Sequence, residues 1–390
     1  MRKVYLDNAA TTILNGEVLK EMMPYFTDIY GNSSSLHSFG RTAVAGVDNA
    51  RDIIAKCIGA KSNELFFTSG GTEANNWAIR GVAYANKSKG NHIITSQIEH
   101  HSVIDTCKQL ENEGFEVSYL PVDSTGLVSI SDLLHEIKPT TTLVSIMAVN
   151  NEIGTIQNIK AISEIVKFYG VIFHVDAVQA LGVMPINVVD LGIDMMSLSA
   201  HKIHGPKGAG ALYIRNGVKI NKFMIGGEQE MNKRGGTQNV PAIVGFGKAC
   251  ELNSRDLSIK DKKMFELSSY FMNKLEYEVS DIKFNGNPYQ KANGIVSVTF
   301  NGIEGENLIM LLDMRGVAAS TGSACASGSL EKSHVLHAIG LDDSQIRGTI
   351  RFSFDINNSK EDIDYAVRVI CEEVDKLRKA SPIKSKKKEK

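Results

Sequence analysis

The chain has 390 residues, 43% of them hydrophobic and 22% charged, with 43 basic residues against 44 acidic ones. This length predicts two to three domains, and the composition excludes long disorder, a collagen-like fibre and a coiled coil as the main architecture. A formal net charge of −1 provides no overall field that would attract nucleic acid or an anionic membrane. Because of this charge balance, we expect no stable complex with nucleic acid. No 18 apolar residues follow one another, so we also expect no membrane span.

Cysteine usage points to a reducing compartment. The five cysteines are scattered and include no CxxC pair: Cys57, Cys107, Cys250, Cys325 and Cys371. This spacing predicts neither a disulfide framework nor a structural zinc site. The first residues contain no apolar stretch of signal-peptide length, and we expect a cytoplasmic protein.

The first 250 residues alternate short apolar runs with amphipathic stretches. Strands are expected at residues 64–68, 92–95, 142–147, 171–175, 195–198 and 210–214, and a helix at residues 74–85. Several of these strands are apolar on both faces, as in a sheet covered by helices on both sides. Strands separated by helical segments predict an α/β fold with a mostly parallel sheet and right-handed crossovers.

The rest of the chain predicts a smaller α+β domain. Polar and charged residues dominate at 253–263, before an expected helix at 265–275, strands at 294–300 and 350–354, and a last helix at 363–377. We predict a large domain of residues 15–255, a small domain of residues 1–14 and 256–380, and a disordered basic tail of residues 381–390.

A glycine-rich turn between the first predicted strand and helix has the features of a phosphate cradle. In Thr68-Ser69-Gly70-Gly71-Thr72, small residues let the backbone approach an anion, and the start of the helix offers unpaired N–H groups. Thr72 adds a hydroxyl group. The segment is neither a Walker loop nor a GxGxxG fingerprint, so a purely structural role for Gly71 stays open at this point.

Two charged residues follow later strands. Asp176 ends a buried apolar strand, where an acid is costly unless it is paired or hydrogen-bonded; a helix N-cap is the alternative. Lys202 follows the strand at 195–198, where partial desolvation would free its amine for Schiff-base formation; a lysine that reaches solvent is the alternative. His201 and His204 lie three residues apart in a turn without a carboxylate pattern, and we expect no metal there.

Small residues surround Cys325 in the segment Ala319–Ser329. A thiol on such a loop, which we expect to be mobile, suggests a nucleophile that must travel, whereas a structural cysteine is the alternative. A phosphate cradle, an acid for a ring nitrogen and a Schiff-base lysine are together what pyridoxal 5'-phosphate (PLP) requires of a protein. The sequence therefore predicts a PLP enzyme.

Longer motifs follow one another along nearly the whole chain: Tyr5–Thr12, Thr68–Asn75, Ile98–His101, Val149–Thr155, His174–Gln179, Ser197–Gly208 and Gly322–Cys325. From about residue 3 to residue 378 the sequence resembles the cysteine desulfurases, which are PLP enzymes of the class V aminotransferase group with the type I fold. The loop Ser320–Cys325 is similar to that of the group that serves iron–sulfur assembly and tRNA thiolation.

The resemblance implies a role for each matching residue. Lys202 would carry PLP and act as acid and base at Cα, Asp176 would pair with the pyridinium nitrogen, and His100 would stack on the ring. The other implied contacts are Gln179 to the phenolic oxygen; Gly71, Thr72, Ser199 and His201 to the phosphate; Thr237 to the phosphate of the partner subunit; Asn151 to cofactor and substrate; and Arg351 to the substrate carboxylate.

The resemblance also implies a reaction and its partners. The thiolate of Cys325 would attack the sulfur of L-cysteine, so that alanine is released and a persulfide remains. A homodimer would pass this sulfur to an acceptor such as an iron–sulfur scaffold protein or a tRNA thiolase. Cys325 would then be a transient iron–sulfur ligand shared with a docked scaffold.

Three positions depart from the family pattern. Ser33 stands where proline is usual, Glu228 where a third glycine is common, and Thr321 where serine is common. An added acid at Glu228, near the expected intersubunit phosphate contact, would weaken PLP binding or change the dimer contact. Two alternatives stay open: an aminotransferase or selenocysteine lyase on the same scaffold, and a PLP-bearing scaffold whose basic tail docks tRNA or a protein.

Overall fold

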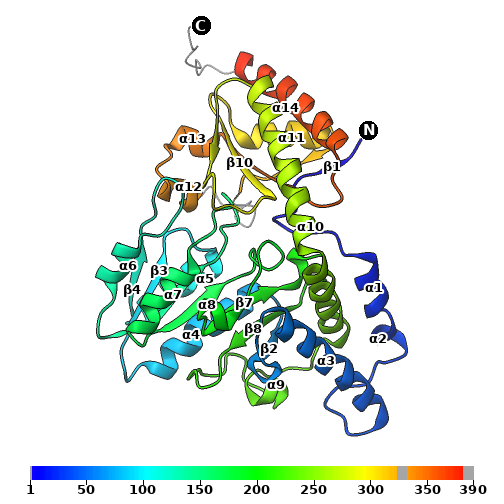
Figure 1. Cartoon of the computed structure of the whole chain (residues 1–390), viewed down its shortest axis with the longest axis vertical. Coiled ribbons are helices and arrows are strands. Elements are labelled where there is room, and N and C mark those ends of the chain that lie inside the picture. Colours follow the sequence, from blue (N-terminus) through cyan, green and yellow to red (C-terminus); the bar gives the residue numbers. More distant parts are fainter. Residues whose placement is uncertain (1, 323–331, 381–390) are drawn as a thin grey trace.

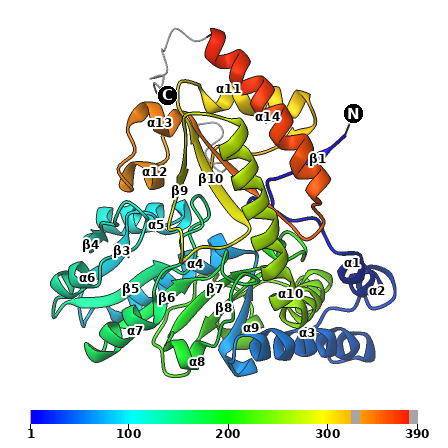
Figure 2. The same cartoon turned by 45° about the horizontal axis from the view of Figure 1, so that its top comes forward.

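The computed structural model describes residues 2–322 and 332–380. Cys325 and the basic tail of residues 381–390 lie outside these ranges. The described chain forms two parts, one above the other in Figure 1, and the long helix α10 (Val240–Glu278) runs from the lower part into the upper one. Figure 2 shows the same connection from a second direction.

The lower part is built on a seven-stranded sheet in which five neighbouring strands are parallel and β8 runs antiparallel to both of its neighbours. In spatial order the strands are β2 (Leu65–Thr68), β8 (Gly210–Ile214), β7 (Met195–Ser199), β6 (Ile172–Asp176), β5 (Thr141–Met147), β3 (His92–Ser96) and β4 (Glu116–Leu120). The crossovers between parallel strands contain helices, as the alternating sequence pattern predicts.

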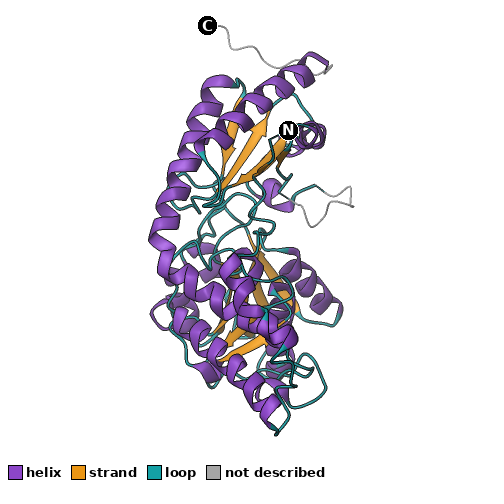
Figure 3. Ribbon diagram, turned by 90° about the vertical axis from the view of Figure 1, so that its right-hand side faces the viewer, coloured by secondary structure: helices purple, strands orange, loops and turns teal. Residues whose placement is uncertain are grey.

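Helices cover both faces of this sheet, as the side view in Figure 3 shows. Successive strand residues point to opposite sides. Phe66 therefore packs against Trp77 in the core formed with α4 and α5, while Phe67 belongs to the core formed with α3, α7 and the first half of α10. The bounds of these helices are α3 (Ser38–Cys57), α4 (Gly71–Asn86), α5 (His101–Asn112) and α7 (Ile159–Phe168).

Shorter elements complete the lower part. They are α1 (Gly16–Met22), α2 (Pro24–Thr27), α6 (Ile130–Glu136), α8 (Val188–Leu191), α9 (Gln229–Asn232) and the 3-10 turns η1 (Ser62–Glu64) and η2 (Ala200–Lys202). The turn η2 directly follows β7 and carries Lys202.

The upper part has an antiparallel sheet of the order β12-β10-β9, packed against helices. Val4 and Leu6 of the N-terminal segment share one core with Phe271 of α10 and with residues near the C-terminus. The elements are β9 (Ile282–Asn285), β10 (Ile295–Phe300), β12 (Thr349–Ser353), α11 (Gly305–Met314), α12 (His334–Ala338), α13 (Asp343–Arg347), α14 (Lys360–Ala380) and the parallel pair β1 (Val4–Tyr5) and β11 (Val317–Ala318).

The predicted α/β fold with its mostly parallel sheet is confirmed, and the expected strands lie within one or two residues of the observed ones. Strand β4 was not predicted, and the helix expected at residues 265–275 is the second half of α10. The predicted domain boundary near residue 255 falls inside this helix, and the division into domains stays a prediction. Within the described ranges, no helix is long and apolar enough to cross a membrane.

Phe271 provides a test of the upper core. Its side chain is fully buried, and its ring centroid lies 5.0 Å from that of Phe352 and 5.3 Å from that of Phe354. Phe271→Ala should lower the free energy of unfolding by about 3–5 kcal/mol, because the truncation leaves a cavity. Urea denaturation followed by circular dichroism measures this loss.

The matched control lies on the same helix, where Phe265 is 55% exposed. Phe265→Ala should change the free energy of unfolding by less than about 0.5 kcal/mol. Equal losses in the two variants would contradict this assignment of the core.

Candidate active site

A cavity of about 330 Å³ lies where the strands of the large sheet end. Open α/β sheets bind ligands at this edge, because the carboxyl ends of parallel strands meet there. The sequence-predicted residues that line the cavity are Gly71, Thr72, His100, Asn151, Asp176, Gln179, Ser199, His201, Lys202 and Arg351. These residues come from distant parts of the sequence, and the fold brings their side chains together around this one cavity.

The first wall of the cavity is the start of α4. Gly70 stands at the N-cap and brings no side-chain cap, so the first N–H groups of the helix stay available to an anion. A Cβ atom on Gly71 would lie 2.5 Å from Cγ2 of Val178, and glycine therefore allows this helix start to approach the opposite wall. Glu73 stabilises the turn, since it accepts a hydrogen bond from Ser69 N at 2.7 Å and pairs with Arg234 at 2.8 Å.

Asp176 stands at the end of β6 and is 5% exposed. Its Oδ1 accepts the backbone N–H of Val178 at 3.0 Å, and its Oδ2 accepts Nδ2 of Asn75 at 2.7 Å. These two donors fix the orientation of a buried carboxylate at the cavity wall. The alternative of a simple helix N-cap is set aside, because no helix begins directly after β6.

Asn75 joins Asp176 to His100. The amide nitrogen of Asn75 also donates to Ser102 Oγ at 2.9 Å, and that hydroxyl lies 2.8 Å from Nδ1 of His100. Ser102 N donates to the same ring nitrogen at 3.1 Å. Burial lowers the pKa of His100, so its ring is neutral at pH 7 and presents a flat, uncharged face.

The amine of Lys202 is held by backbone carbonyls of the N-terminal segment. It donates to Ala9 O at 2.5 Å and to Ala10 O at 2.9 Å, and Gln179 Nε2 donates to Ala9 O at 2.8 Å. His201 lies next to it, and burial lowers the pKa of His201 to about 4. A neutral His201 ring offers hydrogen-bonding nitrogens without adding a second charge beside Lys202.

Arg351 lies in β12 and is 2% exposed. It donates to Asn151 O at 2.8 Å and pairs with Asp7 at 2.8 Å. Its Nε is buried without a hydrogen-bond partner among the described residues. A buried guanidinium that lines a cavity and keeps an unused N–H suits the binding of an anionic ligand group.

Two predicted site residues lie elsewhere. Thr237 is exposed and does not line this cavity, so its predicted contact with a partner's phosphate stays a prediction. Cys325 lies outside the described residues. Gly322, the last described residue before it, lines the cavity.

Sequence reasoning assigned no role to several lining residues: Asn75, Glu99, His101, Ser102, Glu152 and His334. Most of them stand in the motifs that carried the family resemblance. The signal for Asn75 was a polar side chain on the apolar face of α4, next to the buried Ala74 and Trp77. No sequence pattern indicated a site role for His334, because only the fold brings it to the cavity. Its Nε2 lies 2.8 Å from Glu99 O.

Comparison with known proteins decides the family. The class-V aminotransferase profile matches residues 4–366. Curated cysteine desulfurases named IscS are 49% identical over 383 residues in Dictyoglomus turgidum and 50% identical over 385 residues in Methanosarcina thermophila. The alignments cover 98% and 99% of this chain and 97% and 95% of the relatives. The chain belongs to the cysteine desulfurases of the class-V aminotransferase family.

Solved structures agree with the family. A NifS-like protein, 39% identical, matches with a TM-score of 0.91 over 96% of this chain and 100% of its own. A structure of SspA in complex with cysteine, 37% identical, matches with a TM-score of 0.81 over 90% of this chain and 99% of its own. The expected type I fold and the expected family are therefore confirmed.

This cysteine desulfurase is a PLP-dependent enzyme, and the residues of its cavity fit that cofactor. The uncapped start of α4 suits a phosphate, the buried Asp176 suits a protonated ring nitrogen, and Lys202 offers the amine. The neutral ring of His100 suits a stacking contact. In the described parts of the chain, no group of three histidine, cysteine or acidic residues could hold a metal ion.

Glu99 is a second buried acid beside the cavity. Its Oε1 accepts from Ser96 Oγ at 2.6 Å and from Met147 N at 3.0 Å, whereas its Oε2 has no partner in the described ranges. Burial raises the pKa of Glu99 to about 8, so the group is a neutral acid at pH 7. The neutral Glu99 therefore does not repel the negative charge of Asp176.

Asn75→Ala should weaken PLP binding roughly tenfold, because it removes a hydrogen bond to the buried Asp176 carboxylate. The dissociation constant is measured by titrating the apoenzyme with PLP and following absorbance. Asn112→Ala, at the exposed end of α5, serves as the control. Unchanged affinity in Asn75→Ala would show that Asp176 does not depend on this contact.

Glu99 predicts a pH dependence of stability. From pH 4.5 to about 8, the unfolded chain loses the Glu99 proton while the folded chain keeps it. The free energy of unfolding of the wild type should therefore fall with rising pH, relative to Glu99→Gln, by about 1.4 kcal/mol per pH unit. Urea denaturation of both proteins from pH 5 to 9 measures this difference, and a constant difference would contradict a buried neutral acid.

Proposed function

We propose that this cysteine desulfurase uses Lys202, Asp176, His100 and Arg351 to remove the sulfur of L-cysteine, which gives L-alanine and a persulfide on Cys325. The observation that carries the assignment of these residues is the cavity at the strand ends, which brings the first four together. Relatives that are 49% and 50% identical over nearly the whole chain support the reaction.

L-cysteine is the substrate that the site and the neighbours support. SspA, a structural neighbour, forms a complex with cysteine. In this chain, Arg351 is a buried guanidinium whose Nε has no partner among the described residues, and Asp7 and Asn151 fix its orientation. It binds the α-carboxylate, because a guanidinium matches the planar geometry of a carboxylate.

PLP, when bound, supplies an electron sink for the carbanion at the α-carbon of an amino acid. Asp176 holds a negative charge at the cavity wall, and its two N–H donors keep it in place. Lys202 takes the proton from Cα and later returns one, since its amine stands in the same cavity. His100 would stack on the bound ring, and because Nδ1 of its neutral ring accepts from Ser102 N, Nε2 carries the proton that His100 can donate.

Cys325 carries the sulfur step. Its thiolate attacks the sulfur of the substrate, so that an S–S bond forms while the Cβ–S bond breaks. The electron pair of the broken bond stays with the substrate carbon, which is then protonated and leaves as alanine. Gly322 supports this role, because it lines the cavity and stands three residues before Cys325 in the sequence.

The persulfide sulfur goes to an acceptor, such as an iron–sulfur scaffold protein or a tRNA thiolase. On a docked scaffold, Cys325 is then a transient iron–sulfur ligand. The reaction needs reduced thiols, and we propose a cytoplasmic location. The four cysteines in the described ranges are free thiols, in agreement with a reducing compartment: Cys57, Cys107, Cys250 and Cys371.

The active unit is a homodimer in which Thr237 contacts the cofactor phosphate of the partner subunit. Thr237 is exposed in its own subunit, and this exposure leaves it available to a second copy. Several large apolar side chains within residues 13–39 are exposed, and a second copy of the chain would cover them. They include Ile13, Tyr30, Leu36 and Phe39.

Alanine and sulfide released from L-cysteine in the presence of a reductant test the proposal. The wild type should release equal amounts of both, and Cys325→Ser should lose at least about 99% of the rate, because a hydroxyl is a far weaker nucleophile toward sulfur. Cys371→Ser, which removes a thiol on the distant helix α14, should keep the wild-type rate.

Two other outcomes would contradict the proposal, one for the role of Cys325 and one for the reaction. Full activity of Cys325→Ser would show that this thiol does not attack the substrate. Bound PLP without either product from the wild type would favour an aminotransferase or a lyase that acts on another substrate.

A further inference from the structure

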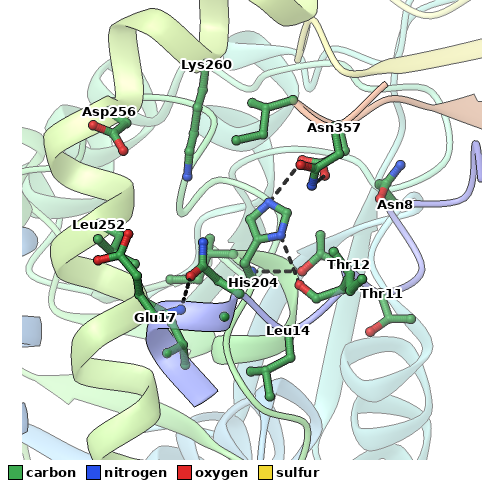
Figure 4. Close-up of a pocket in the computed structure, with 18 of the residues that line it drawn as sticks. Asn8, Thr11, Thr12, Leu14, Glu17, His204, Leu252, Asp256, Lys260 and Asn357 are labelled. Atoms are coloured by element: carbon green, nitrogen blue, oxygen red, sulfur yellow. Dashed lines mark hydrogen bonds and ion pairs between the residues drawn. The ribbon is translucent and has the colours of Figure 1, made fainter. Parts of the chain in front are cut away.

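A second and larger cavity, of about 750 Å³, lies beside the turn that carries Lys202 (Figure 4). It shares none of its lining residues with the active-site cavity. The N-terminal segment, helix α10 and the loop after β12 surround it, and its wall includes His204. The charged residues on the wall are Glu17, Lys207, Arg255, Asp256, Lys260 and Asp355.

His204 makes two hydrogen bonds to groups that only accept. Its Nδ1 lies 3.0 Å from the backbone carbonyl oxygen of Ile13, and its Nε2 lies 3.0 Å from Oδ1 of Asp355. A carbonyl and a carboxylate have no proton to give, so both ring nitrogens must carry one. The geometry therefore describes an imidazolium ion.

The neighbourhood of Asp355 agrees with this charge state. Burial alone would raise the pKa of Asp355, but the hydrogen bond and the charge of His204 outweigh it and hold that pKa below its usual value. Asp355 is thus a carboxylate that faces a cation. Of the other charged groups on the wall, Arg255 pairs with its own neighbour Asp256 at 2.8 Å.

His204 also has a backbone conformation that needs support. Its φ is +65°, in the left-handed region that side chains rarely adopt. Its N–H donates to Thr12 Oγ1 at 2.8 Å, and its carbonyl accepts from Asn15 N at 3.0 Å. Contacts from three directions hold this residue, a pattern typical of strain kept for a functional reason.

The same contacts reach Lys202 through the N-terminal segment. Thr12 bonds the carbonyl of His201 with both its N–H, at 3.0 Å, and its hydroxyl, at 2.9 Å. Three and two residues before Thr12, the carbonyls of Ala9 and Ala10 hold the amine of Lys202. Movement of His204 would therefore shift the carbonyls that orient this amine.

On its other side, His204 reaches the substrate-binding strand. Asp355 follows β12 by two residues, and β12 carries Arg351. One imidazolium thus connects the lysine turn, the N-terminal segment and the strand that holds the proposed carboxylate-binding arginine.

We propose that His204 is a positioning residue that, as an imidazolium, fixes the Lys202 turn relative to the N-terminal segment and to β12. This inference rests on the proposed function of Lys202. The residue touches neither substrate nor cofactor in this account, and it acts by holding the groups that do.

Four variants test the proposal in the holoenzyme. His204→Asn removes both ring contacts, and asparagine tolerates the left-handed backbone. Asp355→Asn keeps the shape of the side chain and removes its charge, and the double variant completes a cycle. His135→Gln, which replaces an exposed histidine of α6, is the control.

We expect His204→Asn to lower kcat for alanine release by roughly tenfold to a hundredfold, because small misplacements of catalytic groups have such effects. KM for L-cysteine should change by less than about threefold, because Arg351 keeps its contacts with Asp7 and Asn151. The dissociation constant of PLP should rise. Asp355→Asn should act in the same direction, and the double variant should be no worse than His204→Asn.

Other results would overturn the proposal. Lower melting temperatures with unchanged kcat and unchanged PLP affinity would make His204 a purely structural residue and overturn the proposal. Multiplicative effects in the double variant would also overturn it, since the two residues would then act independently. If His204→Asn does not fold, Asp355→Asn alone decides by its kcat. If the wild type releases no alanine, the proposed function fails, while PLP affinities across the cycle still test the coupling.

Discussion

At the end of β6, the carboxylate of Asp176 is buried and yet held by two N–H donors, one from Val178 and one from Asn75. A buried charge is costly, and it persists only where hydrogen bonds or an opposite charge compensate for lost water. The surrounding site follows from this requirement. Asn75 must stand on α4 to reach the carboxylate, and the start of α4, the wall proposed for a phosphate group, is thereby placed at the cavity.

The same requirement explains the uncharged neighbours. Glu99 is kept neutral by burial, and the pKa of His100 is lowered by burial. The carboxylate of Asp176 therefore stands between neutral groups on the inner wall of the cavity. A protonated ring nitrogen would pair with this negative charge. With Asp176 held between neutral groups, and with Lys202 and Arg351 as cations elsewhere in the same cavity, the charges are fixed in advance, as expected of a preorganised electrostatic site.

The N-terminal segment joins the two parts of the molecule. Asp7 pairs with Arg351 of the upper sheet, and Ala9 and Ala10 hold the amine of Lys202 in the lower part. Asn8 donates to the carbonyl of Ser353, which extends the contact along β12. The side chains proposed for substrate binding and for proton transfer, Arg351 and Lys202, are thus held by the same few N-terminal residues, although they lie 149 residues apart in the sequence.

Local sequence patterns predicted what depends on local physics. Apolar runs marked the buried strands, and the residues at their ends marked the site, because parallel strands end at one edge. Strand β4 escaped prediction, since Glu116–Leu120 is an edge strand with polar side chains and a weak apolar signal. The polar stretch at 253–263 was interpreted as the region of the domain boundary; in the structure it is the mostly exposed part of α10 that passes between the two parts.

Contacts between distant segments could not be predicted in this way. The bond from Asn75 to Asp176 spans 101 residues, and that from Lys202 to Ala9 spans 193. The packing of helices and strands brings the two residues of each of these hydrogen bonds together, and no spacing in the sequence indicates that they meet. Their places after apolar strands already indicated Lys202 and Asp176, and the family resemblance added their roles, but the residues that hold them needed the structure.

The most direct test of the central claim is to identify the lysine that carries the cofactor. Borohydride reduction of the holoenzyme fixes PLP to the amine that binds it, and peptide mass spectrometry then locates the modified residue. We expect a single pyridoxyl group on Lys202. Modification of another lysine, or of none, would contradict the assignment of this cavity as the active site.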